Sequence, residues 1–239
     1  MTKPGIARSL LFLGLVVSLL GVAPPSSGSD GQDEVGKIVA RVVQAYGGRE
    51  ALERVRAVKQ SGTIQSHRLG KRGSLERLIV LPDRLRVDID YPGGPREQRI
   101  TTPGGAWRDG RAATGPMHLA MVLQMARFRL PLLLSRQGVR LLGEAEGLLR
   151  LGMNLSESTA LEVFVDPASW RIVRSIGHMS FRGMPLSFRA DYSDFRPVGD
   201  LLFAHREELM AMGTPTGIAV LERIEVNPDT TPADFRPLR

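Results

Sequence analysis

The chain of 239 residues contains no cysteine, and this absence removes several functions at the outset. Without thiols the protein can form no disulfide, no thiolate metal site and no cysteine nucleophile. The bacterial lipid anchor that is attached to an N-terminal cysteine is excluded for the same reason.

The sequence also lacks the motifs of metal and covalent chemistry. Its four histidines are far apart, and none has a second histidine four residues away. No HExxH zinc motif, GxSxG nucleophile elbow, phosphate-binding loop or dinucleotide fingerprint occurs. Asp88 and Asp90 alternate on the polar face of a predicted strand, which is typical of a solvated surface. We therefore expect no catalytic residues, no metal site, no cofactor and no enzymatic activity.

Concentrated positive charge is absent as well, although the formal net charge is +7. Lysine occurs only at positions 3, 37, 59 and 71, so scattered arginines carry most of the positive charge. No basic block with interleaved aromatic residues is present, and nucleic acid is not an expected partner. The mild excess of positive charge would favour contact with an anionic membrane surface or an acidic partner.

The only long apolar run lies at the start of the chain. Lys3 and Arg8 precede the apolar residues 10–20, and small residues follow at 26–29. This order is typical of a secretory signal peptide, and the run is short for a membrane span. We predict a signal peptide over 1–29, cleaved near Ser29, followed by a single domain over 30–239. The alternative is a leader that is retained as an N-terminal anchor.

Three helices are predicted from the spacing of apolar residues. Residues 35–46 place Val35, Val42 and Tyr46 on one amphipathic stripe that stops at two glycines, and a short second helix covers 49–55. Residues 116–134 form a helix that is apolar around most of its circumference, which Pro131 should end or kink. A helix of this kind is either ordinary core or a lid whose methionines repack around a ligand.

Most of the remaining chain is predicted to form β-strands. Period-two alternation puts an apolar and a polar face on each of them. The predicted strands are 59–65, 75–81, 84–91, 96–102, 139–142, 148–154, 161–165, 170–176, 186–192, 201–212 and 217–226. A single antiparallel sheet of about 11 strands must curl, because open twisted sheets rarely exceed about 10 strands. The predicted fold class is α+β, a strongly curved antiparallel sheet, or open half-barrel, with helices covering its concave face.

Three segments resemble the LolA-like superfamily of periplasmic lipoprotein carriers and related lipid-binding proteins. They are VVQAYGGREAL at 42–52, DYSDFRPVGDL at 191–201, and IEVNP at 224–228 with Phe235 in the tail. With the order of elements, the resemblance covers nearly the whole mature chain. It implies an open curved sheet capped by helices around a hydrophobic cavity that accepts acyl chains. The lid arginine of the carriers has two candidates here, Arg127 and Arg129.

These expectations define a candidate site. The groove is predicted to be lined by apolar strand residues whose neighbours of opposite parity are charged: Leu85, Val87, Ile89, Tyr91, Leu186, Phe188 and Tyr192. The lid is predicted to present Leu119, Met121, Val122, Met125 and Phe128, with Arg127 and Arg129 at the groove mouth.

The resemblance implies a function for this site. The protein is expected to be a periplasmic monomer that holds acyl chains of a lipid or lipoprotein, for transport or sorting toward the outer membrane. Envelope membrane proteins are further expected partners. The alternative is an envelope sensor or interaction protein whose groove is filled by its own helix.

Overall fold

The computed structural model describes residues 29–136 and 138–237. All but the last residue of the predicted signal peptide therefore lies outside the described residues. The chain begins with α1 (Ser29–Ala45) and α2 (Arg49–Glu53), has α3 (Gly115–Phe128) in its middle, and contains two short 3-10 helices, Leu132–Ser135 and Pro232–Phe235. Among these residues no helix combines the length and apolar character needed to cross a membrane.

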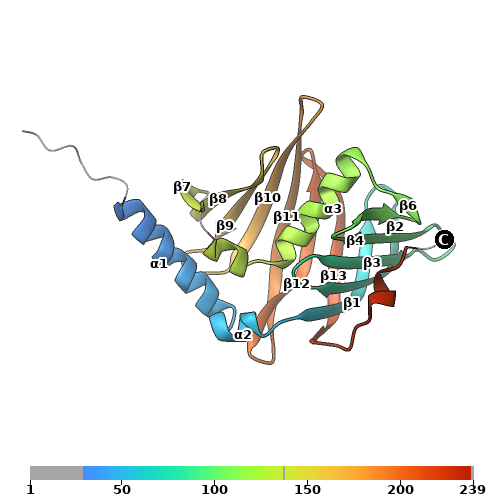
Figure 1. Ribbon diagram of the computed structural model, residues 1–239, viewed down its shortest axis with the longest axis horizontal. Coiled ribbons are helices and arrows are strands. Elements are labelled where there is room, and N and C mark those ends of the chain that lie inside the picture. Colours follow the sequence, from blue (N-terminus) through green and yellow to red (C-terminus); the bar gives the residue numbers. More distant parts are fainter. Residues whose placement is uncertain (1–28, 137, 238–239) are drawn as a thin grey trace, which may run out of the picture.

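The strands form one open antiparallel sheet of thirteen members (Figure 1). They are β1 (Ala57–Ser66), β2 (Lys71–Val80), β3 (Arg84–Asp90), β4 (Arg96–Thr102), β5 (Gly105–Arg108), β6 (Arg111–Ala112), β7 (Arg140–Ala145), β8 (Leu148–Ser156), β9 (Thr159–Val165), β10 (Ile172–Phe181), β11 (Met184–Val198), β12 (Leu201–Ala211) and β13 (Thr214–Val226). The sheet order runs from β6 through β1, then β13, to β7.

This order fixes the position of α3. The chain builds the sheet outward from β1 to β6, passes through α3 to β7 at the opposite edge, and returns to place β13 beside β1. A connection between opposite edges must cross one face of the sheet. Figure 1 shows α3 lying over the curve of the sheet in this way.

The predicted number of about 11 strands is wrong, because the sheet has thirteen. Two of these are the short strands around the turn at Asp109 and Gly110, of four and two residues. Strands this short show no clear period-two alternation in the sequence. The Asp-Gly pair nevertheless indicates the turn between them.

The predicted third helix is also shorter than expected. The α-helix ends at Phe128, and after Pro131 the chain forms a separate 3-10 turn over Leu132–Ser135. Proline lacks the backbone N–H that a continuing α-helix needs, so the break falls where Pro131 predicts it.

The core consists of two apolar clusters on the inner side of the sheet. The first joins the buried stripe of α1 to Leu151, Leu161 and Val163 on β8 and β9. The second joins side chains of β1, β2, β3 and β13, among them Leu85 and Val87. Helix α3 contributes Leu123 to the first cluster and Met125 to the second, so it bridges both halves of the core.

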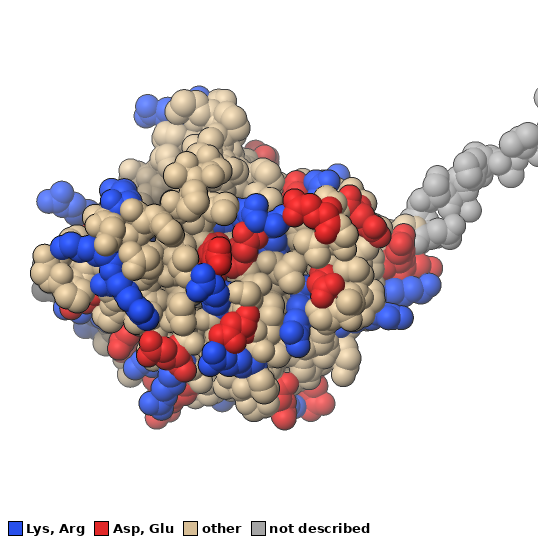
Figure 2. Space-filling view, turned by 180° about the vertical axis from the view of Figure 1, so that it is seen from behind, with Lys and Arg blue, Asp and Glu red and all other residues tan. Residues whose placement is uncertain are grey.

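The outer face of the sheet is covered by charged side chains of both signs. Figure 2 shows acidic and basic groups interspersed over this face. Pairs connect neighbouring strands, for example Arg174 to Asp191 at 2.7 Å and Arg150 to Glu162 at 3.1 Å. Such cross-strand pairs support the register, because a slip by one residue would exchange the apolar and charged faces.

Candidate binding cavity

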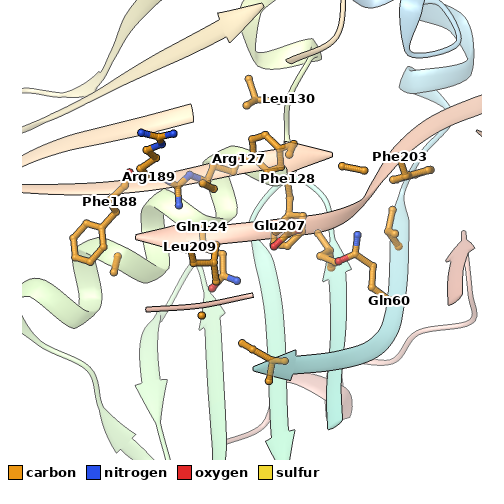
Figure 3. Close-up of a pocket in the computed structure, with 18 of the residues that line it drawn as sticks. Gln60, Gln124, Arg127, Phe128, Leu130, Phe188, Arg189, Phe203, Glu207 and Leu209 are labelled. Carbon is orange, nitrogen blue, oxygen red and sulfur yellow. Dashed lines mark hydrogen bonds between the residues drawn. The ribbon is translucent and has the colours of Figure 1, made fainter. Parts of the chain in front are cut away.

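A cavity of about 560 Å³ lies between α3 and the concave side of the sheet. Its walls come from β1, β11, β12 and α3, with the chain after α3 at one end and hairpin tips at the other. Most of its lining is apolar, including Val58 and Ile64. Phe188, Leu209 and Phe203 are among the apolar lining residues labelled in Figure 3.

One stripe of α3 faces this cavity. Met117, Ala120, Gln124, Arg127 and Phe128 all line it, and they recur at the three- and four-residue spacing of one helical face. Two of the five are polar. The helix therefore places a neutral amide and a guanidinium over the cavity, where the sequence predicts mainly apolar groups.

Several residues predicted to form the inner surface of the lid have other positions. Val122 points outward and is 39% exposed, because it lies on the helix face opposite the cavity. Met121 and Met125 are buried beside the stripe, and Leu119 packs against the first core cluster. Of these five residues only Phe128 lines the cavity, whereas Met117, one of the methionines of the predicted lid, lines it as well.

The side chain that holds α3 most closely to the sheet is Leu123, which sequence analysis did not single out. It is fully buried and lies so close to Gly177 on β10 that a Cβ atom at this glycine would overlap it. Glycine is therefore required here for close approach of helix and strand.

A charged pair crosses the floor of the cavity. Arg77 on β2 donates through both terminal nitrogens to the carboxylate of Glu207 on β12, each at 2.8 Å. Arg77 also donates to Gln60 Oε1 at 3.3 Å, and its guanidinium lies 5.6 Å from the ring centre of Phe128. The Arg77 side chain is 2% exposed and that of Glu207 is 13% exposed, so the pair is largely removed from water.

This pair spans the curve of the sheet. Strands β2 and β12 are separated by β1 and β13, so in a flat sheet their backbones would be about 14 Å apart. The two side chains meet because the sheet curls toward α3. The ion pair is therefore a strut across the concave face, with Gln60 of β1 between its ends.

A second polar group lies where α3 approaches β11. Arg127 Nη2 donates to the carbonyl oxygen of Phe188 at 2.6 Å, while its Nε is buried without a partner among the described residues. Tyr192, on the same strand, shares a hydrogen bond of 2.8 Å with Ser175. Burial raises the pKa of Tyr192, the Glu207 charge adds to this effect, and Arg127 opposes it.

The two predicted groove-mouth arginines are in different environments. Arg127 turns to the backbone of β11, whereas Arg129 lies beyond the end of the helix near Arg136 and Asp83. Burial and the neighbouring Arg136 charge lower the pKa of Arg129. Both arginines line the cavity.

One end of the cavity is closed by aromatic side chains. Tyr46, just after α1, meets Phe195 edge to face with ring centres 6.5 Å apart. The Tyr46 hydroxyl accepts a hydrogen bond from the backbone N–H of Ile172 at 3.1 Å. Burial raises the pKa of Tyr46, and the Ile172 bond opposes this rise in part.

A charged cluster borders the cavity near the start of α3. Glu97 pairs with Arg99 and Arg108 on the inner side of β4 and β5. Burial alone would raise the pKa of Glu97, but the two arginines outweigh it and lower this pKa below its ordinary value.

The predicted groove residues all face inward, but only some border the cavity. Tyr91, Phe188 and Tyr192 line it directly. The others are in the apolar clusters around it: Leu85, Val87, Ile89 and Leu186.

The polar floor is the part of the site that sequence reasoning missed. Two adjacent glutamates on a strand, Glu207 and Glu208, are typical of surface charge, yet the carboxylate of Glu207 is largely buried against Arg77. A signal was present in β2, where Arg77 has the same parity as Leu75 and Ile79. A charged residue on the buried face of a strand needs a partner, although the sequence does not identify it.

The described residues contain no cluster of three or more side chains able to hold a metal ion. Around the cavity they offer apolar walls together with a few hydrogen-bonding and charged groups, of which the Arg77–Glu207 pair and the Glu97 cluster are paired with one another. This arrangement can bind and orient an elongated apolar molecule.

Comparison with known proteins identifies the fold. No protein-family model matches the sequence, and curated proteins give no significant match. The solved structures that share the fold include two with TM-scores just above 0.5. A LolA superfamily protein from Nitrosomonas europaea has a TM-score of 0.52 at 9% identity, and a DUF1329 family protein from Desulfovibrio piger has 0.51 at 9%. Each match covers 84% of this chain and 97% of the other.

A domain from Vibrio parahaemolyticus named for outer membrane lipoprotein sorting also matches, with a TM-score of 0.46 at 12% identity, covering 84% of this chain and 97% of its own. The chain has a LolA-like fold, as its sequence resemblance implies.

Proposed function

We propose that this protein is a non-enzymatic periplasmic binding protein that holds acyl chains of a lipid or lipoprotein in the cavity beneath α3. The single observation that carries the proposal is the cavity itself. About 560 Å³ is within the usual range for small-molecule sites, and the lining is mostly apolar with a few convergent polar groups.

The apolar walls supply the affinity in this proposal. Each methylene group that leaves water contributes about 0.8 kcal/mol, so a chain of ten or more methylenes needs no specific polar contact to bind. Gln124, Arg127 and the Arg77–Glu207 strut then favour one orientation, because a polar head placed beside these groups can hydrogen-bond to them, whereas an apolar end would displace water from them and offer no partner.

The structure bears on the alternative of a groove filled by its own helix. Helix α3 occupies part of the concave face, with Leu123 and Met125 in the core, yet open volume remains beneath its Gln124 face. A completely filled curl would leave no such volume. The remaining cavity favours a carrier or chaperone of lipid over a sensor with a closed interior.

A cavity-filling variant tests the proposal. Ala120 lines the cavity, and Val122 is exposed on the outer face of the same helix. We expect Ala120→Trp to weaken binding of a fluorescent long-chain fatty acid about tenfold or more, because the indole occupies space that the chain needs. The matched variant Val122→Trp should bind like the wild type.

Native mass spectrometry of protein purified from its own envelope is the complementary measurement. We expect a co-purifying lipid or lipoprotein that is absent from the Ala120→Trp variant. Equal probe binding by both tryptophan variants, or no probe binding by the wild type, would rule out the cavity as an acyl-chain site.

A further inference from the structure

Three hairpin tips lie next to one another at one end of the sheet. They are the β1–β2 tip (66–72), the β12–β13 tip (210–217) and the β10–β11 tip (180–187), and together we call them the tip surface. The His67 N–H donates to Thr216 O at 3.0 Å, and the Met212 N–H donates to Ser187 O at 2.9 Å. Figure 1 shows the β10–β11 hairpin projecting beyond the rest of the sheet.

The tip surface exposes large apolar side chains. Met184 is 58% exposed, Met212 is 55% exposed and Leu69 is 36% exposed. They are three of the five large hydrophobic residues that are exposed among the described residues, and the other two are Val122 and Leu142. Their concentration on three neighbouring turns is unusual for single surface hydrophobics, which are normally scattered.

The same tips carry positive charge and no negative charge. Arg68, Lys71, Arg72 and Arg182 are exposed, and none of the three segments contains an aspartate or glutamate. Within the described ranges none of these four side chains forms an ion pair with a carboxylate, whereas basic groups on the outer face of the sheet commonly do. In Figure 2 the projecting tip is tan and blue.

The flanking hairpins limit this surface. Asp90 ends β3 opposite Ser74 of β2, and Glu157 lies in the β8–β9 turn, whose Ser158 accepts a hydrogen bond from the Ser180 N–H. Acidic residues therefore return on both sides, and the acid-free stretch is confined to three adjacent tips.

The tip surface is continuous with the cavity. Arg68, Leu69, Met210, Thr216 and Gly217 line the cavity and also belong to the tips. An acyl chain that entered between these tips would pass from the exposed apolar residues directly into the apolar interior.

We propose that the tip surface docks on an anionic lipid bilayer, with Leu69, Met184 and Met212 entering the interface and the basic residues contacting lipid phosphates. The proposal rests on the proposed acyl-chain function and specifies where the ligand enters. Basic residues are attracted to an anionic membrane surface, and methionine adapts well to a disordered apolar environment. Three side chains without a lipid anchor give weak, reversible attachment, which suits a carrier that must leave again.

Vesicle sedimentation tests the docking. We use vesicles of phosphatidylcholine alone and vesicles of phosphatidylcholine and phosphatidylglycerol in equal parts. We expect binding to the anionic vesicles only, and a decrease as NaCl is added, because salt screens exposed charges. Lys71→Glu with Arg182→Glu should weaken binding about tenfold or more. Arg54→Glu with Arg223→Glu, two exposed arginines away from the tips, should have little effect.

A second set of two double variants tests how much the apolar side chains of the tip surface contribute to vesicle binding. Met184→Ser with Met212→Ser should reduce vesicle binding, whereas Val122→Ser with Leu142→Ser removes two exposed apolar side chains elsewhere on the surface and should not. None of these eight residues lines the cavity, so binding of the soluble fatty acid probe provides an independent readout.

The two experiments distinguish a failure of the docking proposal from a failure of the acyl-chain proposal. Probe binding without vesicle binding would overturn the docking and leave the acyl-chain function intact, and capture of an envelope protein at the tips would then identify a protein partner there. Vesicle binding that the tip and control variants reduce equally would also overturn the docking. Loss of probe binding in the wild type, with tip-dependent vesicle binding preserved, would support the docking and remove the acyl-chain function.

Discussion

At the scale of single residues, the strut between Arg77 and Glu207 is the ion pair that is most completely removed from water among those of the described residues. Burying two charges costs free energy because both lose their hydration. Their mutual attraction offsets this cost only when the geometry of the pair and its hydrogen bonds are good. Here both terminal nitrogens of the guanidinium are bonded to Glu207 and Gln60 supplies a third contact, while the Nε is buried without a partner among the described residues. The pair can therefore hold β2 and β12 together across the concave face.

Removing one end of the strut should be costly. We expect Glu207→Ala to lower the free energy of unfolding by about 3 kcal/mol or more, because Arg77 remains buried without its carboxylate. The matched variant is Glu208→Ala, the next residue of β12, whose pair with Arg206 is exposed and contributes about 0–1 kcal/mol. Urea denaturation measures both values, and equal losses would show that the strut is not special.

The stability of the fold should depend on pH through the carboxylate of Glu97. Arg99 and Arg108 lower its pKa in the folded protein, so its charge stabilises the fold above the ordinary pKa of 4.5. This contribution disappears as the pH falls through the lower folded-state pKa. We expect Glu97→Gln to reduce Tm at neutral pH and to flatten the decline in Tm between about pH 5 and about pH 3. Thermal unfolding across this range is the measurement, and the exposed Glu222→Gln variant should keep the wild-type slope.

At the scale of secondary-structure elements, α3 is both part of the core and the roof of the cavity. Its Leu123 side is fixed against Gly177, while its Gln124 face borders open volume. The two sides of one helix therefore have different packing. Local opening is easiest where few apolar contacts hold an element, so movement should begin on the cavity side.

We predict that α3 is a movable lid whose protection depends on ligand. Hydrogen exchange of residues 117–128 should slow when a long-chain lipid fills the cavity, because the roof then gains contacts beneath it. Exchange of β11 over residues 186–192 should change less and is the internal reference. If α3 without ligand were as strongly protected as this strand, the helix would be fixed core.

The strands were predictable from sequence, whereas the orientation of α3 was not. Alternation on β3 and β11 places Leu85, Val87, Phe188 and Tyr192 inward because period two leaves only two faces to choose between. A helix that is apolar on most sides offers no such choice. Its polar residues are normally assigned to solvent, and here tertiary packing turns Gln124 inward and leaves Val122 exposed.

Contacts between residues far apart in the chain could not be predicted from the sequence, for a related reason. The parity of β2 indicates that Arg77 faces inward, but its partner is 130 residues away on a strand that is not its neighbour in the sheet. Only the curvature of the whole sheet brings Glu207 within reach. Local patterns identify elements, and this contact depends on how thirteen of them curl together.

At the scale of the whole molecule, the proposed periplasmic location requires export. The basic residues, apolar run and small residues at 1–29 predict a signal peptide. We expect the exported protein to begin near residue 30, and N-terminal sequencing of the protein from the cell envelope measures this directly. A protein that still carries Met1 would instead have a retained leader, which would anchor the domain to the membrane.

The open edges of the sheet have a consequence for how the molecule behaves among its neighbours. At one margin β6 has only two residues, and at the other β7 is interrupted by a register shift between Leu141 and Gly143. Neither margin offers a long, regular row of unpaired backbone groups, which is the template that lets sheets join edge to edge. Copies of the protein at high concentration are therefore not expected to polymerise by pairing their edge strands. The cavity of each half-barrel then stays accessible to a ligand.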